Sequence, residues 1–460
     1  MDKTQAFDPN KTMIGGPVGN KTQAMSAMPS VGDPNRTTAF TPPPTGIQIS
    51  ITPSRAATMA NGPAREQFLI ELTAPSDPGL PGMVSQGTRT PVNLCLVIDR
   101  SGSMEGPPLE YAKQACSYVV DMLGPNDVLS IVVFDETVEV LMAPQRVTNR
   151  EAVKSGIAQL QPGYTTNLYD GITLGAQQIA QAMDPSRTSR MIVLSDGDPT
   201  AGIKDFGSLV QNVGNIRGQG ITSTFLGFGP DYNEELLAAM AKKAGGNYYY
   251  IPQPQLLPDV FRIELDKAMS TSLSGAKLIL KLARWVDLRG LTGHTIVPGQ
   301  REVTLELADL EKGASLQIVA DLEFNNHPLG HYRVASGRLT YSDFSSGGTE
   351  AKELDFIMEF TADAARFSAP VNPKVAGAAQ LSAASRAVEK TIMGLKTQAI
   401  TTAAAIQDLQ KTQALLLNQG RVAEAQEVTM AMQAIQRGDQ GGAEKTLMGA
   451  VVNLDQGKSK

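Results

Sequence analysis

Short apolar runs alternate with amphipathic segments through most of residues 90–272. Apolar runs bounded by turn residues predict buried strands at 92–98, 128–134, 138–141, 189–195, 221–227 and 248–251. Helical spacing predicts helices at 109–123, 150–160, 168–183, 203–216, 234–244 and 256–269. Strands joined by crossover helices form a doubly wound, mostly parallel sheet that is covered on both faces. We therefore predict an α/β domain whose ligands bind at the carboxyl ends of its strands.

Strand-like alternation flanks this domain on both sides, at residues 47–75 and 273–362. In the first flank Ile47, Ile49 and Ile51 share one face, and the second flank has five apolar or alternating runs. Neither flank is large enough to close a hydrophobic core alone. We therefore expect both flanks to form one β-sandwich into which the α/β domain is inserted.

The two ends of the chain have different compositions. Residues 1–46 are rich in Pro, Gly, Thr, Asn and Met without apolar periodicity, which predicts a disordered tail. Residues 370–458 are rich in Ala, Gln and Leu, with turn sequences at 418–420 and 438–441. They predict a helical region, either a small antiparallel bundle or a single tetratricopeptide-like pair.

Composition excludes several classes of protein. The chain has 40 Lys and Arg against 46 Asp and Glu, a net charge of −6, which argues against nucleic acid as a partner. Its start lacks the features of a signal peptide, and no apolar run is long enough to span a bilayer. Two cysteines, Cys95 and Cys116, cannot form a disulfide framework and are expected to be buried small hydrophobes. We expect a cytoplasmic protein that has no membrane partner.

Oxygen-bearing side chains follow the predicted strands where each strand ends. Asp99, Ser101 and Ser103 leave the first strand, Thr166 precedes a helix, and Asp196 ends a later strand. Oxygen ligands of this kind suit a hard divalent cation, Mg²⁺ in the first place, or Ca²⁺ or Mn²⁺. The alternative for Asp99, Ser101 and Ser103 taken alone is a turn that caps the next helix.

These residues resemble the metal-ion-dependent adhesion site of von Willebrand factor type A domains. The D-x-S-x-S element is complete as Asp99, Ser101 and Ser103, the second-loop threonine matches Thr166 with Thr165 as a near competitor, and the third-loop aspartate matches Asp196. The resemblance covers about residues 90–272. It implies a metal that keeps one position open for an acidic residue of a partner protein, and a role in assembly rather than catalysis.

Enzymatic motifs are not found in the sequence. Arg100-Ser101 follows Asp99 in place of a D-x-D motif, and neither a dinucleotide-binding nor a P-loop glycine motif occurs. His327 and His331 flank a predicted turn, where a metal site is a weak alternative. Glu105 is likewise a weak candidate for contact with a second, adjacent ion. We therefore expect a protein that is not an enzyme.

The N-terminal tail repeats a short pattern around Thr4, Thr12, Thr22 and Thr37. One interpretation is phosphorylation by a Ser/Thr kinase followed by capture in a forkhead-associated domain, since the residue three positions later is apolar at three of the four threonines. The other is a chance repeat in a low-complexity tail, because Lys-Thr-Gln-Ala also occurs at 396–399 and 411–414 within predicted helix.

Together these features favour a bacterial-type intracellular scaffold that captures an acidic residue of a partner protein on a bound metal. The threonine pattern of the tail suggests kinase and forkhead-associated signalling as its setting. The alternative is a partner subunit of a MoxR- or chelatase-type AAA+ ATPase that acts in metal insertion or complex assembly.

Overall fold

The computed structural model describes residues 46–76, 89–196, 198–229, 232–344 and 346–459. The predicted disordered tail lies outside these residues except for Gly46, and so do Thr4, Thr12, Thr22 and Thr37. Most of the linker expected between residues 75 and 91 also lies outside them. Within the described ranges, no helix combines the length and apolar character needed to cross a bilayer.

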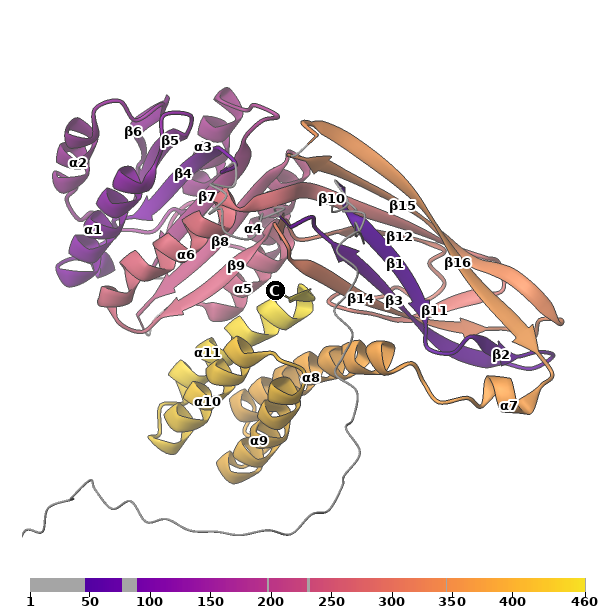
Figure 1. Cartoon of the computed structure of the whole chain (residues 1–460). Helices are drawn as coiled ribbons and strands as arrows, with labels where there is room; N and C mark the ends of the chain where they lie inside the picture. Colours follow the sequence, from indigo (N-terminus) through magenta and orange to yellow (C-terminus); the bar gives the residue numbers. More distant parts are fainter. Residues whose placement is uncertain (1–45, 77–88, 197, 230–231, 345, 460) are drawn as a thin grey trace, which may run out of the picture. The chain divides into compact units, whose positions relative to one another are not determined.

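The α/β domain is built on a six-stranded sheet in the order β6-β5-β4-β7-β8-β9 (Figure 1). Its strands are β4 (Val92–Asp99), β5 (Val128–Phe134), β6 (Val138–Gln145), β7 (Thr188–Ser195), β8 (Ile221–Phe228) and β9 (Gly245–Ile251). All neighbouring strands are parallel except β5 and β6, which are antiparallel. Every residue of β4, β5 and β8 is buried, as expected for strands covered on both faces. The predicted doubly wound, mostly parallel sheet is thus confirmed.

Helices cover the two faces of this sheet and form two separate cores. Leu94 and Leu96 of β4 pack with α1 (Pro107–Met122), α2 (Arg150–Ala158) and α6 (Leu257–Met269). Cys95 and Val97, which alternate with them, pack with α3 (Leu168–Gln181), α4 (Phe206–Gly218) and α5 (Glu234–Ala244). Both cysteines are buried and free, as expected of small hydrophobes.

Two further sheets combine strands from both sides of the α/β domain (Figure 1). The first has the order β1-β3-β14-β11, with β17 also paired to β14, and the second has the order β12-β10-β15-β16-β2, with β13 paired to β10. Their bounds are β1 (Gln48–Pro53), β2 (Ala57–Met59), β3 (Ala64–Thr73), β10 (Thr271–Leu282), β11 (Val286–Leu291), β12 (Glu302–Glu306), β13 (Leu310–Glu311), β14 (Ser315–Phe324), β15 (Gly330–Asp343), β16 (Gly348–Thr361) and β17 (Lys458–Ser459).

The two sheets face each other across one hydrophobic core. The longest pairing between the flanks joins β3 to β14, from Thr73 opposite Ser315 to Ala64 opposite Phe324. Inward-facing residues of both sheets form a single buried cluster, in which the ring centroids of Phe68 and Phe356 are 5.7 Å apart. The strands before residue 75 therefore share a core with the strands after residue 273, as the alternation predicts.

The C-terminal region forms four helices, α8 (Pro373–Lys396), α9 (Thr402–Asn418), α10 (Val422–Gln436) and α11 (Gln440–Asp455), after the short α7 (Ala364–Phe367). Each helix contacts the next, and α11 also contacts α8. Their apolar faces enclose one core, so the region is a small bundle rather than a single tetratricopeptide-like pair. The side chains of Asn372, Thr401 and Asp439 cap the starts of α8, α9 and α11.

Some elements differ from those predicted. The strands β2, β13 and β17 are only two or three residues long, too short for a recognisable period. The sequence pattern does not predict the strand β11, because a bulge after Leu288 breaks the alternation of inward and outward residues. Leu288 faces the core, but the next residue that faces the core is Leu291. The helix expected from residue 203 begins at Phe206, because the side chain of Asp205 caps it by accepting from the backbone N–H of Ser208.

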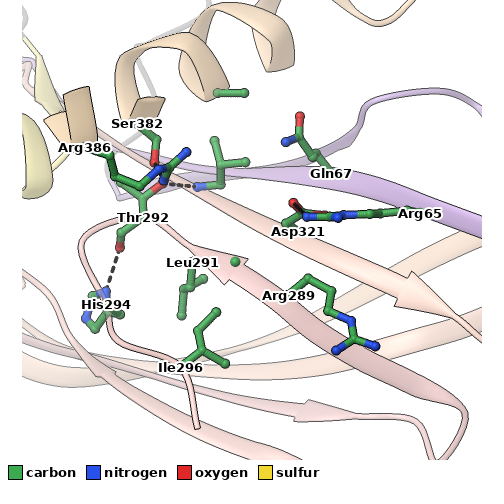
Figure 2. Close-up of a pocket in the computed structure, with 13 residues that line it drawn as sticks. Arg65, Gln67, Arg289, Leu291, Thr292, His294, Ile296, Asp321, Ser382 and Arg386 are labelled. Carbon is green, nitrogen blue, oxygen red and sulfur yellow. Dashed lines mark hydrogen bonds and ion pairs between the residues drawn. The ribbon is translucent and has the colours of Figure 1, made fainter. Parts of the chain in front are cut away.

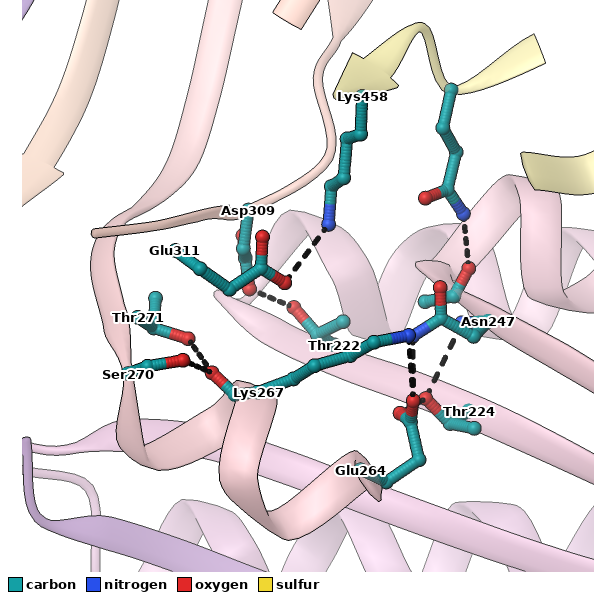
Figure 3. A network of polar contacts seen from close by, with 12 residues as sticks. Thr222, Thr224, Asn247, Glu264, Lys267, Ser270, Thr271, Asp309, Glu311 and Lys458 are labelled. Atoms are coloured by element: carbon teal, nitrogen blue, oxygen red, sulfur yellow. Dashed lines mark hydrogen bonds and ion pairs between the residues drawn. The ribbon is translucent and has the colours of Figure 1, made fainter. Parts of the chain in front are cut away.

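A buried ionic network joins the α/β domain to the sandwich, and Figure 3 shows its contact between Asp309 and Thr222. Asp309, between β12 and β13, pairs with Arg217 of α4 at 2.9 Å and with Arg190 of β7 at 3.0 Å. It also accepts hydrogen bonds from Thr222 of β8 at 2.7 Å and from the backbone of Gly275 in β10 at 3.3 Å. Burial alone would raise the pKa of Asp309, but the two arginines hold it well below its usual value.

The C-terminal residues lie beside this network. Lys458 of β17 pairs with Glu311 of β13 at 3.5 Å (Figure 3). The Lys458 carbonyl accepts a hydrogen bond from Arg421, the residue before α10. The side chain of Gln456 donates to the backbone carbonyl of Gly246 in β9 at 2.5 Å. The last residues of the chain are therefore tied to strands of both the sandwich and the α/β domain.

One carboxyl group of the bundle has a raised pKa, which predicts that the stability of the bundle depends on pH. Glu427 of α10 accepts a hydrogen bond from Asn453 of α11 at 3.4 Å, and its Oε2 atom is buried without a partner among the described residues. Burial raises the pKa of Glu427 to about 8, and the neighbouring Glu424 adds to the rise. Opposing contributions come from Lys267 of α6, Asn453 and Arg421.

We expect the substitution Glu427→Gln to stabilise the protein increasingly as the pH rises. The folded state holds this proton more tightly than the unfolded chain, so the wild type loses free energy of unfolding between about pH 4.5 and 8. The variant avoids this loss, and should be more stable by roughly 1–3 kcal/mol at pH 8 and about equal at pH 4. Urea unfolding at several pH values measures the difference. Glu151→Gln, at a side chain that is 87% exposed, is the control and should change little. A constant difference at all pH values would contradict the assignment.

Candidate metal and partner-binding site

Three loops bring the predicted ligands to one edge of the α/β sheet. Asp99 is the last residue of β4, Ser101 and Ser103 lie at the short 3₁₀ helix Gly102–Met104, Thr166 precedes α3, and Asp196 follows β7. The strands β4 and β7 are parallel neighbours, with Ile98 opposite Leu194, so their carboxyl ends meet. The chain leaves β4 toward β5 on one side and returns to β7 on the other, which makes this edge a topological switch point.

Hydrogen bonds join four of the five predicted ligands into one group. Asp99 Oδ1 accepts from the backbone N–H of Ser101 at 2.8 Å, and the hydroxyl groups of Ser101 and Ser103 are 3.2 Å apart. Ser103 donates to Asp196 Oδ1 at 2.7 Å. Sequence reasoning missed Ser195, the residue before the predicted aspartate, which donates to Asp99 Oδ2 at 2.6 Å. The carboxylates of two neighbouring strands are thus linked through two serines.

The second loop joins this group through its backbone. The backbone N–H of Thr166 donates to the hydroxyl of Thr200 at 2.8 Å, and the Thr166 carbonyl accepts from the backbone of Thr200 and Ala201. Both Thr200 and Ala201 lie in the loop that follows Asp196, so the second and third loops hold each other. The hydroxyl of the competing Thr165 is buried and has no hydrogen-bond partner among the described residues.

The first and second loops are also fixed against each other. The backbone N–H of Gly163 donates to the Arg100 carbonyl at 2.6 Å, and that of Gly102 donates to the Tyr164 carbonyl at 3.3 Å. Any side chain at position 163 would collide with Asp135, because its Cβ would lie 1.8 Å from the carboxylate. Asp135 is itself paired with Arg100 at 3.2 Å. The three loops therefore form a preorganised surface.

The D-x-S-x-S residues do not serve as a helix cap. The 3₁₀ helix begins after Ser101, whose side chain makes no capping hydrogen bond. The helix α1 begins after Gly106, also without a side-chain cap, and Pro107 and Pro108 occupy its first turn. The capping alternative is therefore wrong. The hydroxyl groups of Ser101 and Ser103 contact each other, and Ser103 donates to the carboxylate of Asp196.

Electrostatics at the site favour a bound cation. Burial raises the pKa of Asp99 to about 7, and the neighbouring Asp196 contributes to the rise, while hydrogen bonds from Ser101 and Ser195 oppose it. No Lys or Arg of the described chain lies within ion-pair distance of Asp99. A divalent cation would neutralise this buried negative charge, so the residues present fit such an ion.

The donor set is rich in hydroxyl groups and poor in charge. In the described ranges, no three His, Cys, Asp or Glu side chains gather in an arrangement that could hold a metal ion. A metal here would therefore depend on serine and threonine oxygens beside two carboxylates, which suits a hard cation. His327, the weak alternative, instead lies in an aromatic cluster, with its ring centroid 3.9 Å from that of Trp285.

The surface around the site is open and includes an aromatic side chain. Ser103 and Glu105 are exposed, and Tyr164, beside the first loop, is 81% exposed. Beyond Asp196, the exposed Ile203 and Phe206 lie on the segment that leads into α4. Exposed tyrosine and other apolar side chains beside a polar centre are typical of protein-binding surfaces.

Comparison with known proteins supports the fold described for the α/β domain. Residues 93–262 match the von Willebrand factor type A domain family. The chain is 29% identical over 315 residues to an uncharacterized protein of Synechocystis sp., a match that covers 66% of this chain and 72% of the relative. It is 30% identical over 168 residues to inter-alpha-trypsin inhibitor heavy chain H1 of Sus scrofa, covering 35% of this chain but 18% of the relative.

Two solved structures have a similar fold over most of the chain. A von Willebrand factor type A protein from Catenulispora acidiphila has a TM-score of 0.65 at 18% identity, covering 83% of this chain and 88% of that chain. The ArnB paralog VWA2 from Sulfolobus acidocaldarius has a TM-score of 0.61 at 16% identity, covering 89% and 98%. Residues 93–262 of this protein therefore match the von Willebrand factor type A domain family, and the chain shares its fold with both solved structures.

Proposed function

We propose that this protein is a non-catalytic scaffold that captures an acidic residue of a partner protein on a divalent cation. Asp99, Ser101, Ser103, Thr166 and Asp196 would hold the cation, with Mg²⁺ as the first candidate and Ca²⁺ or Mn²⁺ as alternatives. The observation that carries this proposal is the hydrogen-bonded chain from Asp99 through Ser101 and Ser103 to Asp196, at the switch point of the sheet.

The chemistry of these residues explains why a partner carboxylate would be attracted. Bound there, the cation would supply a positive centre, and neutral hydroxyl ligands would leave more of its charge uncompensated than carboxylates would. Ser103 is exposed, so the partner can approach from its side. Around it, Tyr164 offers a rigid amphipathic contact, which favours a partner whose acidic residue is accompanied by apolar ones.

Two finer parts of the proposal concern its setting. We propose a cytoplasmic location, which the two buried free thiols of Cys95 and Cys116 support. We also propose that Thr4, Thr12, Thr22 and Thr37 are phosphorylated by a Ser/Thr kinase and read by a forkhead-associated domain. This second part is supported only by the sequence pattern of the tail.

The test is affinity capture in which the metal is removed and then restored. We expect a partner to be retained by the wild-type chain in Mg²⁺, released by EDTA, and captured again when Mg²⁺ is added in excess. A chain without residues 1–45 should retain this partner, because the capture site lies in the α/β domain. A separate partner lost only with that deletion would support the phosphothreonine part.

The identity and behaviour of the partner decide between the alternatives. Retention of every partner in EDTA would overturn the metal-based proposal. Capture of a MoxR- or chelatase-type AAA+ ATPase would instead support the alternative function, that of a partner subunit of such an ATPase in metal insertion or complex assembly.

A further inference from the structure

A polar cavity of about 460 Å³ lies between the first sandwich sheet and α8 (Figure 2), and none of its described lining residues belongs to the α/β domain. Three chain segments of the sheet and one helix contribute to it. Its lining residues include Arg65 and Gln67 of β3, Arg289 of β11, Asp321 of β14, and Ser382 and Arg386 of α8. Cavities of this size accommodate small organic molecules.

The cavity has a structural origin in the way α8 meets the sheet. At its start α8 packs on the outer face of the sheet, where Val375 and Ala378 contact Leu69 and Val319. Farther along the same face of the helix, Ser382 and Arg386 replace the apolar residues. The opposing residues of the sheet are also polar, because Arg65, Gln67 and Asp321 share the outer face with Leu69 and Val319. Close packing of the helix on the sheet would need apolar side chains at these positions. Because the residues are polar instead, a hydrophilic space remains between the helix and the sheet.

Among the described lining residues of this space, one guanidinium group, that of Arg386, has no carboxylate within ion-pair distance. Arg65 is held by two hydrogen bonds to Asp321, at 2.7 and 2.6 Å, which also neutralise its charge. Arg386 donates to the hydroxyl of Ser382 at 2.9 Å, and no carboxylate of the described chain lies within ion-pair distance of it. Arg289 is the extra residue of the bulge in β11 and forms an ion pair with Glu323 at 2.6 Å, which neutralises its charge as Asp321 neutralises that of Arg65. Three guanidinium groups thus line a cavity to which Asp321 contributes the single carboxylate among its described lining residues.

The hydroxyl group of Thr292 adds one neutral donor to the lining, whereas the Nδ1 proton of His294 is used within the protein. The Thr292 hydroxyl accepts from the backbone N–H of Val319 at 3.0 Å, which leaves its own proton free to donate. His294 donates from Nδ1 to the Thr292 carbonyl at 2.7 Å, and Figure 2 shows both residues below Arg386. Guanidinium groups beside hydroxyl donors are the usual means of binding a phosphate or carboxylate group.

We propose that this cavity binds a small hydrophilic anion that carries a phosphate or carboxylate group, and that Arg386 is its principal charged contact. The anion would join α8 to the sheet, because Arg386 belongs to the helix and Arg65 and Arg289 belong to the strands. This site is independent of the metal site, since it shares none of that site's residues.

The test is isothermal titration calorimetry of the full chain with inorganic phosphate and, separately, with succinate. Metal is first removed with EDTA, and the EDTA is then dialysed away because it carries carboxylate groups itself; NaCl keeps the ionic strength constant. We expect saturable binding of at least one probe, weakened about tenfold or more by Arg386→Met, because a charge-assisted hydrogen-bonded contact is lost. Arg338→Met is the matched control, since Arg338 lies on β15 and pairs with Glu353 at 2.6 Å outside the cavity; it should bind like the wild type.

The arms of the experiment separate the possible ligands. Tighter binding of phosphate than of succinate would assign a phosphate ligand, and the reverse a carboxylate ligand. Equal affinity of the wild type and Arg386→Met for both probes, or no saturable binding of either, would overturn the proposal. Arg386 is exposed, so unchanged circular dichroism of the variant is expected and shows that any loss of binding is local.

Discussion

Replacement of Asp309 by alanine is expected to lower the free energy of unfolding by about 3–5 kcal/mol. The substitution leaves the guanidinium groups of Arg217 and Arg190 in a buried site without their shared carboxylate, and it removes the acceptor for Thr222. A charge that is buried and unpaired costs far more than a charge pair gains at a surface. Urea unfolding followed by the fluorescence of Trp285, the single tryptophan of the chain, measures the loss in the sandwich.

The same carboxylate gives this prediction a dependence on pH. Because the folded pKa of Asp309 lies well below that of the unfolded chain, its contribution is fully present above about pH 4. The contribution disappears as the pH falls through the folded pKa, so the wild type and Asp309→Ala should converge in strong acid. Asp355→Ala is the control, because Asp355 forms an exposed pair with Arg333, and it should cost less than about 1 kcal/mol. Similar losses in both variants would show that the buried network does not stabilise the junction.

Replacement of Asp99 by alanine is expected to weaken Mg²⁺ binding by about 100-fold or more and to abolish metal-dependent capture of the partner. Asp99 is the buried carboxylate at the centre of the proposed site, and it orients Ser101 and accepts from Ser195. Calorimetric titration with Mg²⁺ measures the first effect, and affinity capture measures the second.

The control for this prediction is an aspartate of the same domain. Asp121 on α1 pairs with Lys154 at 2.6 Å on the surface, so Asp121→Ala should bind Mg²⁺ and the partner like the wild type. Asp99→Asn keeps the size and part of the hydrogen bonding, and should lose the metal while it keeps the fold. Mg²⁺ binding by Asp99→Ala that equals the wild type would place the metal elsewhere.

The sequence predicted the α/β domain well because its signals are local. Strands such as β4 are buried on both faces and read as continuous apolar runs, and the loops that follow β4 and β7 carry the oxygen ligands. Four of those ligands come together as expected, since the carboxyl ends of parallel neighbours must meet. The contact of Ser195 with Asp99 was not predicted, because no sequence pattern distinguishes a serine of the site from any other serine at the end of a buried strand.

Other features depend on contacts that no local pattern contains. The bulge at Arg289 breaks the alternation of β11, and β17 has only two residues. The cavity at α8 combines Arg65 with Arg386, which are more than 300 positions apart in the chain. Nothing near Asp309 in the sequence indicates its two arginines, which belong to β7 and α4. Such features become visible only when the sheets are assembled.

The pairing of β3 with β14 also constrains the order in which the chain can fold during synthesis. Thr73 of β3 leaves the ribosome 242 residues before its partner Ser315, while all strands of the α/β sheet emerge between them. Until β14 has been synthesised, the edge of β3 that later pairs with β14 remains unpaired. Unpaired strand edges promote aggregation and chaperone binding. The α/β domain can fold during this interval, and the sandwich closes afterwards. The strand β17 follows the four helices of the bundle in the chain, so it can be added to β14 only after they have been synthesised.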